Sequence, residues 1–200
     1  YQGKETPGCA SKNFRRKNEM LVPFERLHRS YKGQGLANFL GGISKPQERI
    51  RYTVDFIEQT TGLTGVGEYL TFLLELDSFF LNEDRHTNNL AVIRNEKTKE
   101  FRLCPVFDNG LALLSDLNDY PLDEDVYDCI RRVRAKPFDS DFDAQVEDAE
   151  ALYGMQLKLS FTEKAVAKEL EFVKELYGEG IHRRVERVLF EQMRKYQVYF

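Results

Sequence analysis

Three oxygen-bearing side chains, Asp84, Asn89 and Asp108, stand where apolar runs of the sequence end. Asp84 and Asn89 belong to NEDRHTNN, which follows a long apolar run, and Asp108 opens DNG after a second run. Two carboxylates and an amide oxygen are hard ligands suited to Mg²⁺, which usually shares its coordination sphere with phosphate. Phosphoryl transfer needs one group to orient the attacking hydroxyl and others to hold the metal ions that bridge the phosphates. The residue types and their order therefore predict a phosphoryl-transfer site.

The elements around these residues are expected to bring them together. An apolar helix from about Val66 to Leu81 should be central and should end just before the first motif. The runs Leu90–Arg94 and Phe101–Phe107 flank the polar turn NEKTKE and predict a β-hairpin. Asn89 precedes the first strand and Asp108 follows the second, so both should lie at the same end of the hairpin.

The remaining pattern is mostly helical, and the predicted fold class is α+β with one small central β-hairpin. Residues 1–23 are expected to be irregular or extended because they combine Gly and Pro with mixed charge. Residues 24–40 carry a helical pattern with a break at Gly33 and Gly35, and residues 46–62 predict a helix that begins at Pro46. A short helix is expected at residues 126–133, within the acidic stretch 115–145. In the C-terminal part, SFTE begins one predicted helix and residues 181–193 mark another.

Composition excludes several classes of protein. The 200 residues are 42% hydrophobic and 31% charged, which suits one globular domain or one lobe of a larger protein. The net charge of −4 and the scattered basic residues argue against direct binding of nucleic acid. No apolar stretch is long enough to cross a membrane, and no secretory signal pattern is visible. Three cysteines without a C-x-x-C pair favour a reducing cytoplasm, with Cys104 as a packed core thiol.

NEDRHTNN followed by LCPVFDNG resembles the catalytic core of the HipA-like kinases, bacterial serine/threonine kinases that include persistence toxins and CtkA-type members. CASKNF, ERIRYTVDFIEQTTG, YPLDEDVYDCIRRVRAKPF and DFDAQVEDAEALYG also resemble CtkA-type members, so the likeness covers most of residues 9–155. Phosphatidylinositol kinases share D-R-H-x-x-N but continue with D-F-G, whereas Asn109 stands here. The resemblance implies a protein-kinase-like C-terminal lobe over residues 24–200, with residues 1–23 as a remnant of the N-terminal lobe or a hinge lead-in.

The resemblance also implies a role for each site residue. Asp84 matches the catalytic base, and His86 would be a structural or phosphate-proximal member of the D-R-H motif. Asn89 and Asp108 match ligands of the metal that accompanies ATP, and Gly110 matches the glycine that lets the following loop turn. The implied function is transfer of the ATP γ-phosphate to a protein hydroxyl with Mg²⁺, in a cytoplasmic protein with a protein substrate, a possible antitoxin partner and no membrane association.

The sequence departs from a complete kinase. GQG at 33–35 and GVG at 65–67 are not followed by the strand pattern of a phosphate loop, and no strand lysine with a partner glutamate is visible. A non-catalytic, pseudokinase-like module that docks a partner such as a DNA-binding antitoxin is therefore an alternative. A lipid or small-molecule kinase is another, because it would use the same chemistry on a different acceptor.

Simpler interpretations apply to single residues. Asp84 and Asp108 are compatible with turns, since D-N-G is a common turn sequence. Arg85 is expected to pair with a nearby carboxylate, and His86 is compatible with a loop histidine. His28 and His182 are expected at the surface, and the acidic run Asp116–Asp128 suits a solvated loop or an activation-type segment.

Overall fold

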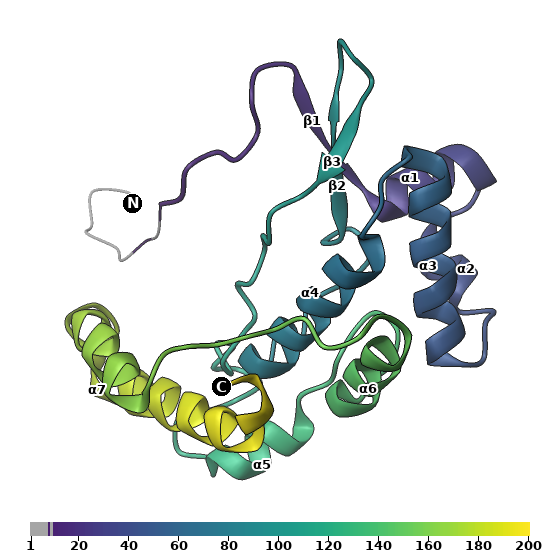
Figure 1. The fold of residues 1–200 in the computed structure, drawn as a ribbon. Helices are drawn as coiled ribbons and strands as arrows, with labels where there is room; N and C mark the ends of the chain where they lie inside the picture. The colour runs from purple at the N-terminus through teal and green to yellow at the C-terminus, as the bar shows by residue number, and fades with distance from the viewer. Residues whose placement is uncertain (1–7, 9) are drawn as a thin grey trace.

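The computed structural model describes residue 8 and residues 10–200, and it confirms a mostly helical α+β fold (Figure 1). Part of the predicted lead-in segment, including Cys9, lies outside the described residues. The described chain forms one small antiparallel sheet, and helix α4 crosses the centre of the molecule below it (Figure 1). No helix among the described residues has the length and apolar character needed to cross a membrane.

The sheet has three strands in the order β1-β2-β3, with β1 at Glu19–Pro23, β2 at Ala91–Asn95 and β3 at Phe101–Leu103. The predicted hairpin is thus confirmed as β2 and β3, although β3 ends earlier than predicted, two residues before Pro105, which has no N–H to donate. Strand β1 pairs antiparallel with β2, with Leu21 opposite Ile93. A strand was not predicted in this part of the lead-in segment, because a short apolar run is a weak signal by itself.

Four helices, α1 to α4, separate β1 from β2 in the sequence, and they span Phe24–Lys32, Leu36–Leu40, Pro46–Thr61 and Val66–Phe80. The predicted break after α1 is confirmed, since Gly33 ends that helix in the left-handed conformation with φ 75°. Helix α3 begins at Pro46 as predicted, and Gly62 ends it with φ 73°.

Helix α4 is the central element, as its apolar composition predicted. Ten of its residues are buried, and it packs along helix α6, which spans Phe142–Tyr153. Gly67 allows this approach, because a Cβ atom at this position would lie 2.3 Å from the ring of Tyr153. Helix α6 was not predicted. Its N-terminus is capped by Asp141, whose carboxylate accepts a hydrogen bond from the Ala144 N–H at 3.0 Å.

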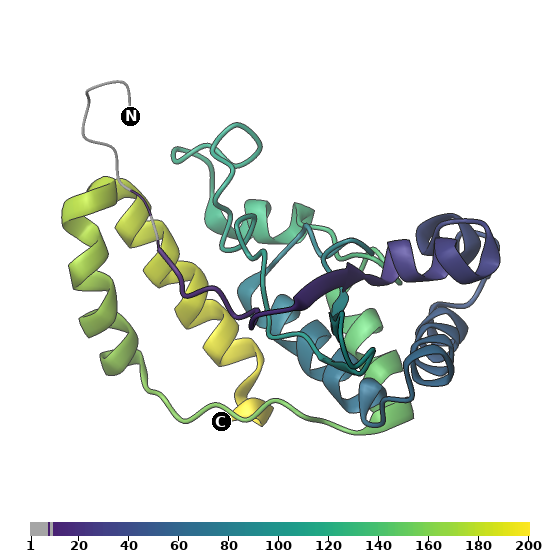
Figure 2. The ribbon, with the colours of Figure 1, turned by 90° about the horizontal axis from the view of Figure 1, so that it is seen from above.

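The C-terminal part folds back on α4. Helix α5 spans Val126–Arg132, and helix α7 spans Glu163–Lys195 before a short 3₁₀ turn at Gln197–Tyr199. Gly178 breaks α7 with φ 79° and ψ 163°, so the two helices predicted from the sequence are present as two halves of α7. The halves meet at this break and diverge from it in a V-shaped helical hairpin (Figures 1 and 2).

The expected surface position of His28 is wrong, because the side chain is fully buried. Its Nε2 lies 2.8 Å from the hydroxyl of Tyr52, and its Nδ1 lies 2.7 Å from the carbonyl oxygen of Gln34. The rings of Phe39 and Phe56 also pack on it. The flanking Arg and Lys residues suggested exposure, but α2 and α3 cover this face of α1.

Candidate active site

The candidate site begins where α4 ends. Leu81 follows the helix in the left-handed conformation, with φ 52° and ψ 47°, and turns the chain into the loop that carries NEDRHTNN. Asp77, in the last turn of α4, receives a hydrogen bond of 2.7 Å from the Asn82 side-chain amide. This contact fixes the first residue of the loop against the helix.

Arg85 holds the loop in place with all five of its N–H donors. Nε and Nη2 donate to the two carboxylate oxygens of Asp77, at 2.7 and 2.9 Å. Nη1 donates to the backbone carbonyls of Asn89, at 3.1 Å, and Phe107, at 2.8 Å. Nη2 also donates to Oδ1 of Asn109 at 2.6 Å. The expectation that Arg85 pairs with a carboxylate is confirmed, and the side chain is fully buried.

Arg85 therefore joins three separate parts of the chain: the end of α4, the end of the loop, and the segment after β3. Asp108 stands between Phe107 and Asn109, both of which accept hydrogen bonds from this guanidinium group. Nη1 of Arg85 donates to the backbone carbonyl of Asn89 as well as to that of Phe107. The segments that carry the predicted residues are thus brought together through one buried side chain.

Asp84 and Asn89 are also linked directly. The Asn89 side-chain amide donates a hydrogen bond of 2.9 Å to the carbonyl oxygen of Asp84. Since the nitrogen of this amide is used internally, its Oδ1 is left for another partner. The Asp84 carboxylate is partly exposed and lies 3.6 Å from Nζ of Lys136 and 3.8 Å from Nε2 of His86. Its exposure and the basic side chains beside it suit a carboxylate that acts on a ligand.

Asp108 is exposed and adopts the left-handed conformation with φ 58°. Within the described part of the chain, its carboxylate has no hydrogen bond or ion pair, unlike a carboxylate that simply stabilises a turn. Gly110 lies two residues on and is also exposed. Its φ is not in the left-handed region, whereas Leu113 and Leu114 adopt it with φ 56° and 59°. In this conformation the turn of the chain does not depend on Gly110.

His86 has one nitrogen at the site and one inside the protein. Its Nε2 lies near Asp84, whereas Nδ1 is buried and has no hydrogen-bond partner among the described residues. The loop bends tightly around it, since the His86 N–H donates to the Asp84 carbonyl at 2.8 Å and the Asn89 N–H donates to the His86 carbonyl at 2.8 Å. Its role as a structural or phosphate-proximal member of the D-R-H motif stays a prediction.

The segment after DNG is attached to the end of α4, to the loop and to α7. The Leu113 N–H donates to the Phe80 carbonyl at 2.8 Å, and the Tyr120 hydroxyl donates to the Glu83 carboxylate at 2.7 Å. Burial, with a smaller effect of that hydrogen bond, raises the pKa of the Tyr120 hydroxyl. Arg184 of α7 donates to the Tyr120 carbonyl. Part of the acidic run is thus held beside the candidate site, and its role as an activation-type segment stays a prediction.

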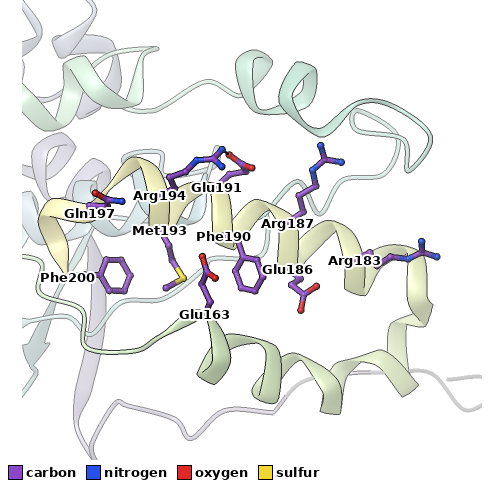
Figure 3. Close-up of a pocket in the computed structure, with 10 residues that line it drawn as sticks. All are labelled: Glu163, Arg183, Glu186, Arg187, Phe190, Glu191, Met193, Arg194, Gln197 and Phe200. Atoms are coloured by element: carbon purple, nitrogen blue, oxygen red, sulfur yellow. Dashed lines mark hydrogen bonds and ion pairs between the residues drawn. The ribbon is translucent and has the colours of Figure 1, made fainter.

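Two open grooves differ in their relation to the site. One of about 580 Å³ borders the loop at Asn88 and is lined otherwise by Glu25, Arg26, Arg29 and Ser30 of α1. The other, of about 820 Å³, lies on α7 (Figure 3). Phe190 and Met193 point there toward the first half of the helix, while Arg187 points away (Figure 3). None of the predicted site residues lines this second groove.

The oxygen ligands of Asn89 and Asp108 suit a Mg²⁺ ion bound together with nucleotide better than a metal held by protein ligands alone. No group of three or more His, Cys, Asp or Glu side chains in the described part of the chain is arranged to bind a metal. Asn89 Oδ1 and the Asp108 carboxylate offer two hard oxygen ligands. Mg²⁺ is commonly bound through one or two protein oxygens together with waters and substrate phosphates. Asn89 and Asp108 are therefore suited to hold such an ion.

Two residues of this site were missed from the sequence. Asp77 lies in an apolar helix, and a charged residue in a buried helix is a signal that a partner must be near, because an unpaired buried charge is costly. Lys136 lies far along the chain from Asp84, and no local pattern indicated that it reaches the loop.

The fold is that of a kinase-like lobe. The solved structure of the Helicobacter pylori proinflammatory kinase CtkA is similar, with a TM-score of 0.61 over 92% of this chain and 70% of that chain, at 14% sequence identity. No protein-family model and no curated protein matches the sequence. The likeness at this identity concerns the fold.

Proposed function

We propose that this chain is the catalytic lobe of a HipA-like serine/threonine protein kinase that uses Mg²⁺ and transfers the γ-phosphate of ATP to a protein hydroxyl. The observation that carries the proposal is the Arg85 network. It joins the loop of Asp84 and Asn89 to the segment of Asp108 through a group that is itself fully buried. If Asp84 and Asp108 only stabilised turns, these two segments would not need to be joined.

In the proposed reaction, Asp84 orients the acceptor hydroxyl and takes its proton as the oxygen attacks the γ-phosphorus. The bond from the γ-phosphorus to the bridging oxygen breaks, and ADP leaves with the electron pair. Asn89 and Asp108 would hold the Mg²⁺ ion, which would neutralise charge on the phosphates. Arg85 does not contact substrate in this proposal, because its donors are used within the protein.

Binding of ATP with and without Mg²⁺ tests the proposal. Titration calorimetry would be carried out on this chain and on a version extended upstream. The expected result is nucleotide binding that requires Mg²⁺, at least in the extended protein. Absence of Mg²⁺-dependent binding in both proteins would overturn the proposal.

One observation favours a second function, a non-catalytic module that docks a protein partner. None of the described strands carries a lysine, so a strand lysine for the ATP phosphates is not present in the described part of the chain. In this case ATP would not bind in either protein, and the fold would serve as a docking platform. A lipid or small-molecule kinase would instead bind Mg²⁺-ATP normally and would be recognised by its acceptor.

A further inference from the structure

A lysine from a distant segment reaches the Asp84 carboxylate. Nζ of Lys136 lies 3.6 Å from Oδ1 of Asp84, and Lys136 belongs to the connection between α5 and α6. Its side chain is 52% exposed, and that of Asp84 is 32% exposed. The Lys136 side chain is thus accessible from solvent beside a partly exposed carboxylate.

The connection that carries Lys136 is firmly attached to the helical core. Ala135 and Phe138, on either side, are buried. The Phe138 N–H donates to Oε1 of the buried Gln145 at 3.0 Å, and the Phe138 carbonyl accepts a hydrogen bond of 2.8 Å from Arg49 of α3. The Ala135 N–H donates to the Ser140 carbonyl at 2.9 Å. The backbone at Lys136 is therefore fixed, and its side chain starts from a defined position beside the loop.

The other basic groups near Asp84 are less suited to bind an anion. Arg85 already donates all five N–H groups to protein acceptors. His86 presents Nε2 at 3.8 Å from the Asp84 carboxylate and carries a charge only when it is protonated. Among the described residues within 4 Å of this carboxylate, Lys136 is the one that presents an exposed ammonium group.

We infer that Lys136 is a catalytic residue that contacts an oxygen of the γ-phosphoryl group during its transfer. The inference rests on the proposed function. Negative charge spreads over the equatorial oxygens of the transferring group, and a fixed cation beside the acceptor hydroxyl would stabilise it. Lys136 neither gains nor loses a proton in this step. The hydroxyl proton passes to Asp84, the new bond joins the acceptor oxygen to phosphorus, and ADP leaves.

The test compares Lys136→Met with the parental full-length protein, using Lys136→Arg to restore the charge. Lys45→Met is the matched control, because Lys45 is also exposed and pairs with an acid, Glu48, at 3.5 Å. The affinities for Mg²⁺-ATP and Mg²⁺-ADP are measured, together with kcat for transfer of the γ-phosphate. Lys136→Met should lower kcat by roughly 10²–10³, as for loss of one preorganised donor. It should weaken ATP binding by roughly tenfold and leave ADP binding within a few-fold, because only ATP carries the γ-phosphate.

Lys136→Arg should recover part of kcat, and Lys45→Met should match the parental protein. The inference would be overturned if the parental protein binds ATP and transfers phosphate, and Lys136→Met has the same kcat and the same ratio of ATP to ADP affinity. That result would leave the proposed function intact. A parental protein that binds no Mg²⁺-nucleotide would overturn both. Circular dichroism and thermal melting of the exposed-site variants verify that each is folded.

Discussion

Arg85 and Asp77 form a bidentate ion pair in which both side chains are almost completely buried, with N–O distances of 2.7 and 2.9 Å. The pair connects the most buried helix of the molecule to the loop that carries Asp84 and Asn89. The positions of Asp84 and Asn89 therefore depend on a buried ion pair that lies beneath the candidate site and is not part of it.

Loss of this pair should destabilise the whole lobe. Arg85→Met would leave Asp77 as an uncompensated buried charge and would remove the donors for three further acceptors. We expect the free energy of unfolding to fall by about 3–5 kcal/mol in urea denaturation. Arg131→Met is the control, because Arg131 forms an exposed ion pair with Asp128, and its loss should cost about 1 kcal/mol or less. Equal effects of the two substitutions would contradict this view of the site.

Asp108→Ala should abolish Mg²⁺-dependent nucleotide binding and leave the fold intact. The Asp108 side chain is exposed and makes no contact in the described structure that would contribute to stability. Calorimetric titration with Mg²⁺-ATP and a thermal melt of the same sample measure both properties. Asp123→Ala, an exposed acid in the following loop, should bind as the parental protein does. Parental Mg²⁺-ATP affinity in Asp108→Ala would exclude it as the main metal ligand.

Asp84→Asn should separate binding from transfer. A general base acts on the transition state more than on bound nucleotide. In a protein that includes the phosphate-binding lobe, we expect ATP affinity within a few-fold of the parental value and a transfer rate lower by roughly 10²–10⁴. Turnover of labelled ATP gives the rate. Asp55→Asn, on the exposed face of α3, is the control. A parental rate in Asp84→Asn would mean that Asp84 only stabilises the turn.

Glu75 should make stability depend on pH. Its carboxylate is buried in α4 and accepts hydrogen bonds from the N–H groups of Gln156 at 2.9 Å and Leu157 at 2.6 Å. The pKa of Glu75 is raised to about 7, mainly by burial and also by the neighbouring Glu150. The hydrogen bonds from the two N–H groups act in the opposite direction and lower the pKa. Because the pKa of Glu75 is higher in the folded than in the unfolded state, the stability that it contributes is fully present below about pH 4.5 and is lost as pH rises toward 7.

Urea denaturation between pH 5 and 8 measures this effect. The parental protein should lose on the order of 1–3 kcal/mol over the range, and Glu75→Gln should flatten the curve because the amide does not ionise. Glu68→Gln, on an exposed position of the same helix, should follow the parental curve. Parallel curves for the parental protein and Glu75→Gln would rule out Glu75 as the titrating group.

The strongest local patterns predicted the centre of the fold. Helix α4 and the hairpin were predicted because an all-round apolar helix and paired apolar runs depend little on their surroundings. Helix α6 was missed because its acidic residues obscure a buried face that exists only against α4. Likewise, His28 appears polar in the sequence and becomes a core residue only once α2 and α3 cover it.

In the candidate site, too, local sequence patterns predicted some features, whereas others depend on packing between distant segments. The order of Asp84, Asn89 and Asp108 was visible in the sequence, and a carboxylate partner for Arg85 was predicted and is confirmed. The identity of that partner as Asp77, and the approach of Lys136 to Asp84, arise from three-dimensional packing between segments that no sequence pattern relates.

The pairing of β1 with β2 has a consequence for the order in which the protein folds. Pro23 and Ala91 are neighbours in the sheet, yet helices α1 to α4 lie between them in the chain. The backbone must close this long loop before the two strands can bond, and such non-local contacts slow folding. The helices should therefore gain structure while the β2–β3 hairpin still lacks its third strand, so a chain that lacks residues 19–23 would expose one edge of β2 to pairing with another molecule.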